Sequence, residues 1–334
     1  MQVMLLAAGR STRLGELGTV LPKPLVPICG YPAITFALAL CRRAGLTDVV
    51  VNLHHHGELI RRELGDGAAH GISIRYSDEP ELLGTGGGIA KARPLFRPGP
   101  VLVMNGKVVA DIDLARVVAA HQAAPSGTAA TMVLRQDPNL DQWSPVGVDD
   151  TGRVVSLRRQ RSDHTPVGSI SDRMFTGIHI LEPALLDRLP PTGVSDVIGE
   201  AYIPALLAGA RIQSLTMTGY FAEHSTPERY LDGNLALLRN PALVPTPPGP
   251  LVGIDPAASV HPRARILMPV RIAPGAVIEE GATVGPLAVI GSGARVLAGA
   301  VVQRSVLWPG TLAGGEVREQ VVTTSPGAVR EGES

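Results

Sequence analysis

The sequence predicts an α/β protein with a mostly parallel sheet, followed by a parallel β-helix. In the first half of the chain, short apolar segments alternate with helical ones, which favours a parallel sheet covered by helices on both faces. Near the C-terminus the apolar pattern changes to a six-residue period, which is typical of β-helices. A proline-rich stretch separates the two patterns, so we expect two structured parts within the 334 residues.

The alternation in the first half identifies the elements one by one. Strands are predicted over residues 2–8, 48–53, 72–77 and 101–105, and helices over 34–45, 58–64 and 87–96, the last beginning after a run of glycines. In a Rossmann-like sheet of this kind, ligands bind at the carboxyl ends of the strands. Gly9, Asn105 and Lys107 each follow a predicted strand, and we expect the site near them.

Nine aliphatic residues spaced six apart define the second part. They are Ile254, Val260, Ile266, Ile272, Ile278, Val284, Ile290, Val296 and Val302. We expect short parallel strands from residue 254 to about 302, with all nine side chains inside a triangular coil. The repeat resembles that of left-handed hexapeptide β-helices. Its single histidine, His261, argues against the acyl transfer that some such proteins perform.

The two patterns divide the chain into four segments. We expect an α/β domain over residues 1–236, a linker over 237–252, a β-helix over 253–325 and a flexible tail over 326–334. Solenoids have open ends and flat faces that other surfaces cover. We therefore expect the β-helix to hold subunits together in a homo-oligomer.

The composition excludes several classes of protein. With 30 basic and 30 acidic residues there is no positive surplus that would indicate nucleic acid. Two cysteines exclude a disulfide framework and fit a reducing cytoplasm. No run of 18 apolar residues predicts a membrane span, and the start of the chain lacks the basic region of a secretion signal. Only Lys23, Lys91 and Lys107 are lysines among the 30 basic residues, which favours a chemical role for Lys23 and Lys107.

The segment LLAAGRSTRLGELGTVLPKPLVPICGYP at residues 5–32 carries the main motif. A strand leads into a glycine-containing loop with Arg13, and Lys23 follows between two prolines. Backbone N–H groups of such a loop can bind phosphates, and the two cations can neutralise them. The segment predicts a triphosphate site.

With this segment, the chain resembles the sugar-1-phosphate nucleotidyltransferases over about residues 1–235. LLGTGGGIAKA (82–92) resembles the loop that reads the base, VLVMNG (101–106) the strand that leads to the metal site, and FTGIHIL (175–181) the strand that contacts the sugar. HHHGELI and TGGGI look most like the branch acting on N-acetylmuramate 1-phosphate, which usually lacks the β-helix. The resemblance implies that an NTP or NDP-sugar and a sugar 1-phosphate bind, and that the sugar phosphate displaces pyrophosphate.

The resemblance also implies roles for single residues. Arg13 stabilises the leaving pyrophosphate, and Lys23 bridges toward the α-phosphate. The nucleotide-binding residues are Ala7, Ala8, Gly9, Gly84 and Thr85. The residues that bind the sugar phosphate are Asn105, Arg159, Arg161, Thr176 and Gly177.

The chain departs from the family pattern at the metal site. Lys107 stands where the family has an aspartate that binds Mg²⁺, which leaves Glu223 as the candidate metal ligand. We predict an ion pair between Lys107 and Glu223, with nitrogen and oxygen within about 4 Å. Two functions stay open. Either Lys107 is catalytic and Arg159 or Arg161 binds the phosphate, or the chain is a non-catalytic sensor of nucleotide sugars that regulates a catalytic paralogue.

Overall fold

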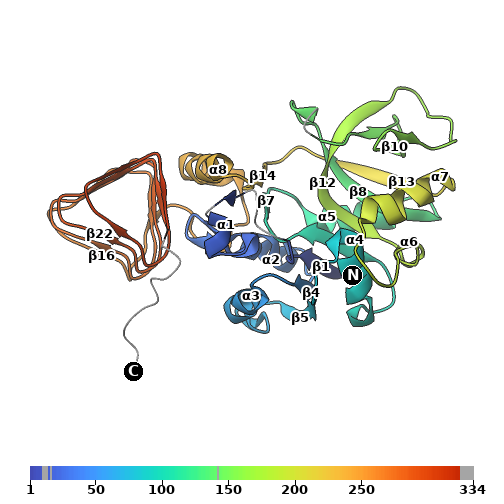
Figure 1. Ribbon diagram of the computed structural model, residues 1–334. Coiled ribbons are helices and arrows are strands. Elements are labelled where there is room, and N and C mark those ends of the chain that lie inside the picture. The colour runs from blue at the N-terminus through green and yellow to red at the C-terminus, as the bar shows by residue number, and fades with distance from the viewer. Residues whose placement is uncertain (10–13, 16, 141–142, 324–334) are drawn as a thin grey trace. The chain divides into compact units, whose positions relative to one another are not determined.

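The computed structural model describes residues 1–9, 14–15, 17–140 and 143–323 (Figure 1). Arg13 and the predicted tail at 326–334 lie outside these residues. The chain forms two compact units, and the first comprises Met1–Gly9, Ala37–Gly106 and Ile112–Gly219. The second unit comprises the remaining segments. Within the described ranges, every helix is too short or too polar to cross a membrane.

The first unit contains a ten-stranded mixed sheet, in which four consecutive strands ending at one edge are parallel, as predicted. The parallel strands are β6 (Val101–Asn105), β1 (Gln2–Leu6), β4 (Asp48–Leu53) and β5 (Ser73–Asp78), in that order. An antiparallel strand, β12 (Ser171–Leu181), pairs with β6 and extends the sheet toward β9 (Val146–Val148), β10 (Val154–Leu157) and β11 (Gln160–Arg161). β8 (Thr128–Arg135) also pairs with β12, and β13 (Arg211–Met217) runs parallel to β8.

Helices of the first unit pack on this sheet. They are the main part of α2 (Ala33–Arg43), α3 (Gly57–Leu64), α4 (Gly84–Ala92), α5 (Leu114–Gln122), α6 (Pro183–Leu186) and α7 (Ile203–Leu207). α4 contacts β1, β4 and β5, whereas α5 contacts β8 and β13. The Asp113 carboxylate accepts hydrogen bonds from the backbone amides of Ala115 and Arg116 and so caps the start of α5.

The helix predicted after the glycine run in fact contains the glycines. α4 begins at Gly84 and ends at Ala92, whereas the sequence predicts residues 87–96. The reason is close packing. A Cβ at Gly87 would lie 2.5 Å from the Gly193 carbonyl oxygen, and one at Gly88 would lie 2.7 Å from a Glu79 carboxylate oxygen. Glycine lets this helix approach its neighbours more closely than any other residue would.

The second unit joins short segments from three regions of the chain. α1 (Leu17–Val20), the 3₁₀ turn Lys23–Leu25, β2 (Pro27–Ile28) and β3 (Tyr31–Pro32) come from the first region. β7 (Val108–Ala110) pairs antiparallel with β14 (Phe221–Glu223), and α8 (Pro227–Arg239) follows. The predicted linker contains the end of α8, a 3₁₀ turn at Pro241–Leu243, and the buried side chains Val244 and Leu251.

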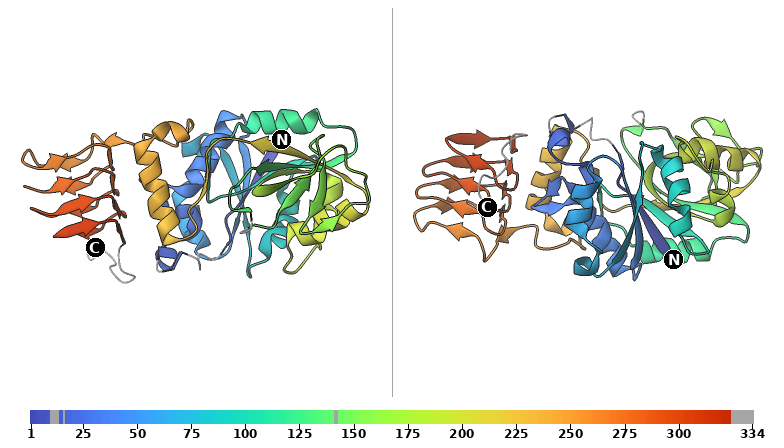
Figure 2. Two further views of the ribbon diagram at one scale, coloured as in Figure 1. Left: turned by 90° about the horizontal axis from the view of Figure 1, so that it is seen from above. Right: turned by 60° about the horizontal axis from the view of Figure 1, so that its bottom comes forward.

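The β-helix consists of three parallel sheets, which form the sides of a triangle in Figure 1. Figure 2 shows the successive coils lying one beside the next. The first sheet contains β15 (Gly253–Ile254), β18 (Val270–Ile272), β21 (Ala288–Ile290), β24 (Val306–Leu307) and β27 (Val321–Val322). The second contains β16 (Ser259–Val260), β19 (Val277–Ile278), β22 (Arg295–Val296) and β25 (Leu312–Ala313). The third contains β17 (Arg265–Ile266), β20 (Thr283–Val284), β23 (Val301–Gln303) and β26 (Glu316–Arg318). The predicted left-handed β-helix fold class is confirmed by this arrangement.

The burial of the repeat residues agrees with the prediction except at the first coil. The six from Ile272 to Val302 are buried, and they form one core with the alanines that precede them. The prediction is wrong for Ile254, whose side chain is 45% exposed, because no earlier coil covers it. The strands continue to Val322, within the predicted β-helix segment 253–325 but past the regular repeat that was predicted to about residue 302. The repeat becomes irregular there, because Leu307 follows Val302 after five residues and Val317 follows Ala313 after four.

Candidate functional site

The end of β1 is fixed by a chain of buried hydrogen bonds. Ala7 and Ala8 are buried and Gly9 is exposed. The Ala7 amide donates to Asn52 Oδ1 at 2.7 Å, and Asn52 Nδ2 donates to Glu79 Oε1 at 2.7 Å. The other Glu79 oxygen accepts the Leu83 amide at 3.1 Å, directly before α4. The predicted nucleotide-binding segments at residues 7–9 and 84–85 are thus connected by Asn52 and Glu79, which no sequence motif identified.

The start of α4 is held by the segment around Ser195. Gly84 has a φ of +73°, and a Cβ there would lie 2.5 Å from the Ser195 carbonyl oxygen. That oxygen accepts the Gly86 amide at 2.9 Å. The Thr85 hydroxyl donates to Asp196 Oδ1 at 3.3 Å and accepts the Val197 amide at 3.1 Å. The glycines at the start of α4 therefore allow the helix to pack closely against the segment around Ser195.

Asn105 and Gly177, two residues predicted to bind the sugar phosphate, lie close together where β6 and β12 are adjacent. A Cβ at Gly177, whose φ is +75°, would lie 2.4 Å from Asn105 Nδ2. The pairing of β12 with β8 shifts register between Phe175 and His179, which indicates a bulge at this point. The Thr176 hydroxyl is buried and donates to the Val133 carbonyl oxygen at 2.8 Å.

The arginine-rich segment RRQR forms a hairpin. Arg159 and Arg161 are exposed. Their neighbour Arg158, which the sequence did not identify as a site residue, forms an ion pair with Asp196, with Nη1 and Oδ2 2.6 Å apart. Since Asp196 also binds Thr85, one carboxylate connects this hairpin with the start of α4.

A cavity of about 170 Å³ lies beside this ion pair in the first unit. Its lining is largely apolar and includes Trp143, Phe175 and Ile198. Among the lining residues that the structure describes, Arg158 alone is charged.

Lys23 belongs to the second unit and is 9% exposed at the start of its 3₁₀ turn. The segment that follows is fixed by α8, because the Tyr230 hydroxyl donates to the Pro27 carbonyl oxygen at 2.6 Å. Asn234 Oδ1 accepts the Cys29 amide at 2.7 Å. The indole of Trp308, in the β-helix, donates to the Tyr230 hydroxyl at 3.0 Å.

The predicted ion pair between Lys107 and Glu223 is confirmed. Lys107 Nζ lies 3.1 Å from Glu223 Oε2, and the two side chains are 20% and 14% exposed. The paired strands β7 and β14 bring them together, since Glu223 lies opposite Val108.

This arrangement does not fit a magnesium ion. Mg²⁺ prefers oxygen ligands in an octahedral shell, whereas the Glu223 carboxylate here contacts an ammonium group. Over the part of the chain that the structure describes, no three histidine, cysteine, aspartate or glutamate residues cluster as metal ligands would.

Burial keeps the two cysteines and two of the histidines uncharged. Burial raises the pKa of Cys29 and of Cys41 to about 12, so both thiols are protonated. Burial lowers the pKa of His179 to about 3 and that of His224 to about 4. Both imidazoles are therefore neutral near pH 7.

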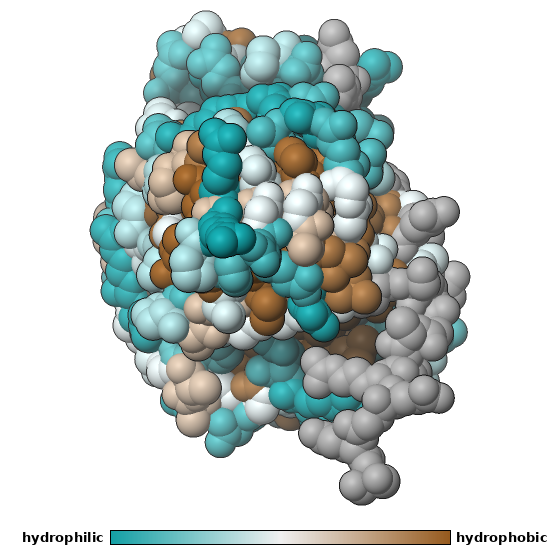
Figure 3. All heavy atoms as spheres, turned by 90° about the vertical axis from the view of Figure 1, so that its left-hand side faces the viewer, coloured by the Kyte–Doolittle hydropathy of each residue, from teal (hydrophilic) through white to brown (hydrophobic). Residues whose placement is uncertain are grey.

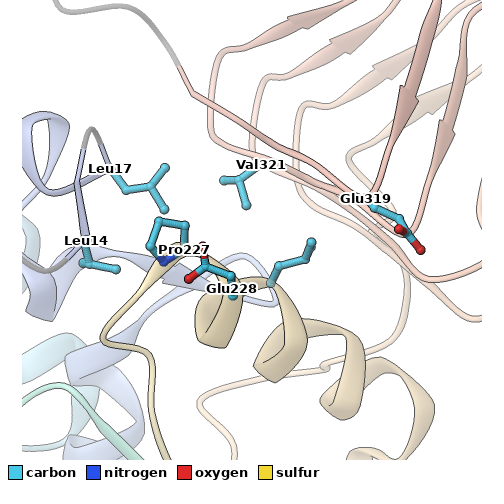
Figure 4. A pocket seen from close by; sticks show the side chains of 7 residues that line it. Leu14, Leu17, Pro227, Glu228, Glu319 and Val321 are labelled. Carbon is cyan, nitrogen blue, oxygen red and sulfur yellow. The ribbon is translucent and has the colours of Figure 1, made fainter.

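A second cavity, of about 420 Å³, lies in the second unit (Figure 4). Leu14, Leu17 and Val321 give it an apolar lining, and the charged residues among its described lining are Glu228 and Glu319.

Comparisons with known proteins agree with these observations. The family described as nucleotidyl transferase matches residues 2–238. A mannose-1-phosphate guanylyltransferase of Mycobacterium tuberculosis is 31% identical over 246 residues, which cover 73% of this chain and 66% of that protein. An N-acetylmuramate alpha-1-phosphate uridylyltransferase of Neisseria meningitidis is 35% identical over 196 residues, covering 58% of this chain and 81% of that protein.

The fold is also similar to solved structures. The structure of HddC from Yersinia pseudotuberculosis complexed with GMP-PN superposes with a TM-score of 0.58 at 18% identity. The superposition covers 71% of this chain and 99% of HddC. With the match of the family over residues 2–238, the chain belongs to the nucleotidyl transferase family.

Proposed function

We propose that the protein transfers a nucleotidyl group from an NTP to a sugar 1-phosphate. An oxygen of the sugar phosphate attacks the α-phosphorus, the bond from that phosphorus to the bridging oxygen breaks, and pyrophosphate leaves with the electron pair. The observation that carries the proposal is the family match over residues 2–238, which contains every predicted site residue. The names of the two relatives, both sugar-1-phosphate nucleotidyltransferases, support the same substrate class.

In this proposal the protein positions two anions and offsets their repulsion. Gly84 and Thr85 border the base, and Asn105 and Gly177 border the sugar. Lys23 supplies positive charge to the α-phosphate. Positioning and charge stabilisation are the main sources of catalysis in phosphoryl transfer.

Lys107 takes part as a cation that Glu223 orients. A lysine ammonium carries one positive charge and three N–H donors, less charge than a divalent ion. We therefore expect turnover that is slow and independent of Mg²⁺. The ion pair at 3.1 Å also favours a second candidate function, a non-catalytic sensor of NDP-sugars, because it occupies the Lys107 ammonium with a partner.

The test is a panel of NTP and sugar 1-phosphate pairs assayed for pyrophosphate, with Mg²⁺ and with EDTA. Catalysis predicts turnover by the wild type in EDTA and a lower rate for Lys107→Ala. The sensor predicts an inert wild type, tight NDP-sugar binding, and Mg²⁺-dependent turnover in Lys107→Asp. If the wild type neither turns over nor binds any nucleotide, both functions are refuted.

We also propose that the β-helix mediates assembly of a homo-oligomer. Ile254, Met268 and Leu312 are large apolar side chains that are 45%, 56% and 62% exposed on it. Hydrophobic residues lie among hydrophilic ones on the face drawn in Figure 3. Light scattering at micromolar concentration should give a mass of at least two chains, and a monomer would contradict the proposal.

A further inference from the structure

Two buried polar side chains lie at the carboxyl ends of neighbouring strands in the first unit. Asn52 belongs to β4 and lies opposite Leu6, the last residue of β1 (Figure 1). Glu79 directly follows β5, the other neighbour of β4. The two residues are 2% and 4% exposed. Burial of an amide and a carboxylate is costly unless both are hydrogen-bonded, and ligands of parallel sheets bind at this edge. The partners of the pair therefore bear on ligand binding.

The hydrogen bonds of the pair have a fixed direction. Both oxygens of Glu79 face N–H donors, since Oε1 accepts from Asn52 and Oε2 accepts from the Leu83 amide. A carboxylate cannot donate, so Asn52 turns its Nδ2 toward Glu79 and its Oδ1 toward the Ala7 amide. One carboxylate thus orients the acceptor at the end of β1 and also binds Leu83, the residue directly before α4.

Glu79 is itself held in place by the end of β4. Its amide donates to the Leu53 carbonyl oxygen at 2.7 Å, and its own carbonyl oxygen lies 3.0 Å from His54 Nδ1. Since a carbonyl oxygen only accepts, His54 Nδ1 is the donor. A Cβ at Gly88 would lie 2.7 Å from Glu79 Oε1 and 2.8 Å from Asn52 Nδ2. The first histidine of HHHGELI thus holds Glu79, and the last glycine of TGGGI leaves room for it.

We propose that Glu79 is a positioning residue for the nucleotide, because it fixes the spacing between the end of β1 and the start of α4. The inference rests on the proposed function, in which residues 7–9 and 84–85 bind the nucleotide. Glu79 holds one amide at each segment, directly at Leu83 and through Asn52 at Ala7. Since the phosphates and the base belong to one ligand, both segments must be correctly spaced at once. Misplacement of a binding group by about 1 Å can lower a rate by about 100-fold.

Electrostatic repulsion alone predicts the opposite effect. A carboxylate near a triphosphate repels it, so removal of the Glu79 charge should tighten nucleotide binding if charge were its only influence. Loss of its hydrogen bonds should instead weaken binding. The sign of the change in affinity therefore separates the two explanations.

Calorimetry with ATP, CTP, GTP, UTP and dTTP as separate ligands tests the inference. Glu79→Gln offers one amide oxygen to two donors, so either Asn52 or Leu83 loses its acceptor. Asn52→Asp places a second carboxylate against the first. We expect the nucleotide that binds the wild type to bind each single variant roughly 10- to 100-fold more weakly, the range of a hydrogen bond to a charged group.

The double variant Asn52→Asp with Glu79→Gln reverses only the middle hydrogen bond. The new carboxylate accepts from Ala7 and from the new glutamine amide, whose oxygen accepts from Leu83. The total charge is that of the wild type. Because the two changes compensate, affinity should recover to within about fivefold of the wild type.

Glu81→Gln is the matched control. Glu81 is exposed in the same loop, so this change removes a carboxylate and leaves the contact between Asn52 and Glu79 in place. Nucleotide affinity should change by less than about twofold.

Partial unfolding of a variant cannot imitate these results, because calorimetry reports the binding-competent fraction as the stoichiometry, separately from the dissociation constant. If Glu79→Gln does not fold, His54→Leu tests the same arrangement, since it removes only the bond to the Glu79 carbonyl oxygen. It should weaken nucleotide binding by roughly 2- to 10-fold, the range of a neutral hydrogen bond.

Unchanged or tighter nucleotide binding by Glu79→Gln, or by His54→Leu where it takes that place, would overturn the inference. A double variant no better than the single ones, or an equal loss in Glu81→Gln, would overturn it as well. In each of these cases, nucleotide binding by the wild type would still support the proposed function. A wild type that binds none of the five nucleotides would refute both.

Discussion

Removing the Lys107 ammonium tests whether its ion pair stabilises the second unit. Replacing it with methionine keeps the length of the side chain and leaves the Glu223 carboxylate, 14% exposed, without its partner. Glu223→Gln leaves the ammonium without its partner in the same way. The double variant Lys107→Met with Glu223→Gln leaves neither charge.

The size of the effect follows from the distance and the burial. At 3.1 Å, an effective dielectric constant of about 20 gives an attraction of roughly 5 kcal/mol. Desolvation of both partly buried groups offsets much of it. A coupling energy of about 1.5–3 kcal/mol is therefore expected, as for a hydrogen bond between charged groups. Each single variant should lose about 2–4 kcal/mol, and the double variant should lose less than their sum.

Urea unfolding followed by tryptophan fluorescence measures this coupling. Trp308 belongs to the second unit and Trp143 to the first, so a Trp143→Phe background makes fluorescence report on the unit that contains the ion pair. The exposed pair Arg263–Glu280, with side chains 78% and 53% exposed, is the control. Its coupling should stay below about 0.5 kcal/mol, as is usual for surface pairs. A Lys107–Glu223 coupling as small as the control's would refute the reasoning, because burial would then have no effect.

Three further outcomes are expected. As the pH falls from about 7 to about 5.5, each unit should lose about 1.2 kcal/mol, because unfolded histidine protonates near pH 6.5 while His179 and His224 keep pKa values of about 3 and about 4. This stability is present above about pH 6.5 and lost below it, and His224→Leu should flatten the profile of the second unit only. Cys29 and Cys41 should resist iodoacetamide in the native protein and react fully in denaturant, as mass spectrometry would show. Gly84→Ala should weaken nucleotide binding at least about tenfold by calorimetry, because its Cβ would lie 2.5 Å from a backbone carbonyl oxygen; unchanged affinity would exclude the helix start from the site.

The β-helix could be predicted in detail because its signal is local in the sequence. A six-residue period fixes which side chains point inward, and each coil repeats the rule. The failure at Ile254 has a physical cause, since periodicity gives the direction of a side chain but not whether a neighbouring coil covers it. The Lys107–Glu223 pair could be predicted for a different reason: the motifs resemble a family in which these two positions face each other.

The Arg158–Asp196 pair could not be predicted in either way. Its partners are distant in the sequence, and the hairpin that presents Arg158 has no Asn-Gly or Asp-Gly signal. The same holds for Asn52 and Glu79, whose hydrogen bonds hold the end of β1 and the start of α4. No sequence pattern identifies the hydrogen-bond partner of a polar residue that lies within a buried strand. Such contacts become visible only when the sheet brings the strands together.

The β-helix makes hydrogen bonds that reach the segment following Lys23. Trp308 donates to Tyr230, and Tyr230 donates to the carbonyl oxygen of Pro27, four residues after Lys23. Arg271 of the β-helix is 3% exposed and donates to the Tyr31 hydroxyl at 3.1 Å. A buried polar group that loses its hydrogen-bond partner lowers the free energy of unfolding. These bonds therefore constrain the segment from Pro27 to Tyr31. A module that only joined subunits would not need such bonds to the residues that follow Lys23. The β-helix is therefore part of the structure that fixes the position of this cation, and a chain ending before residue 253 would lack it.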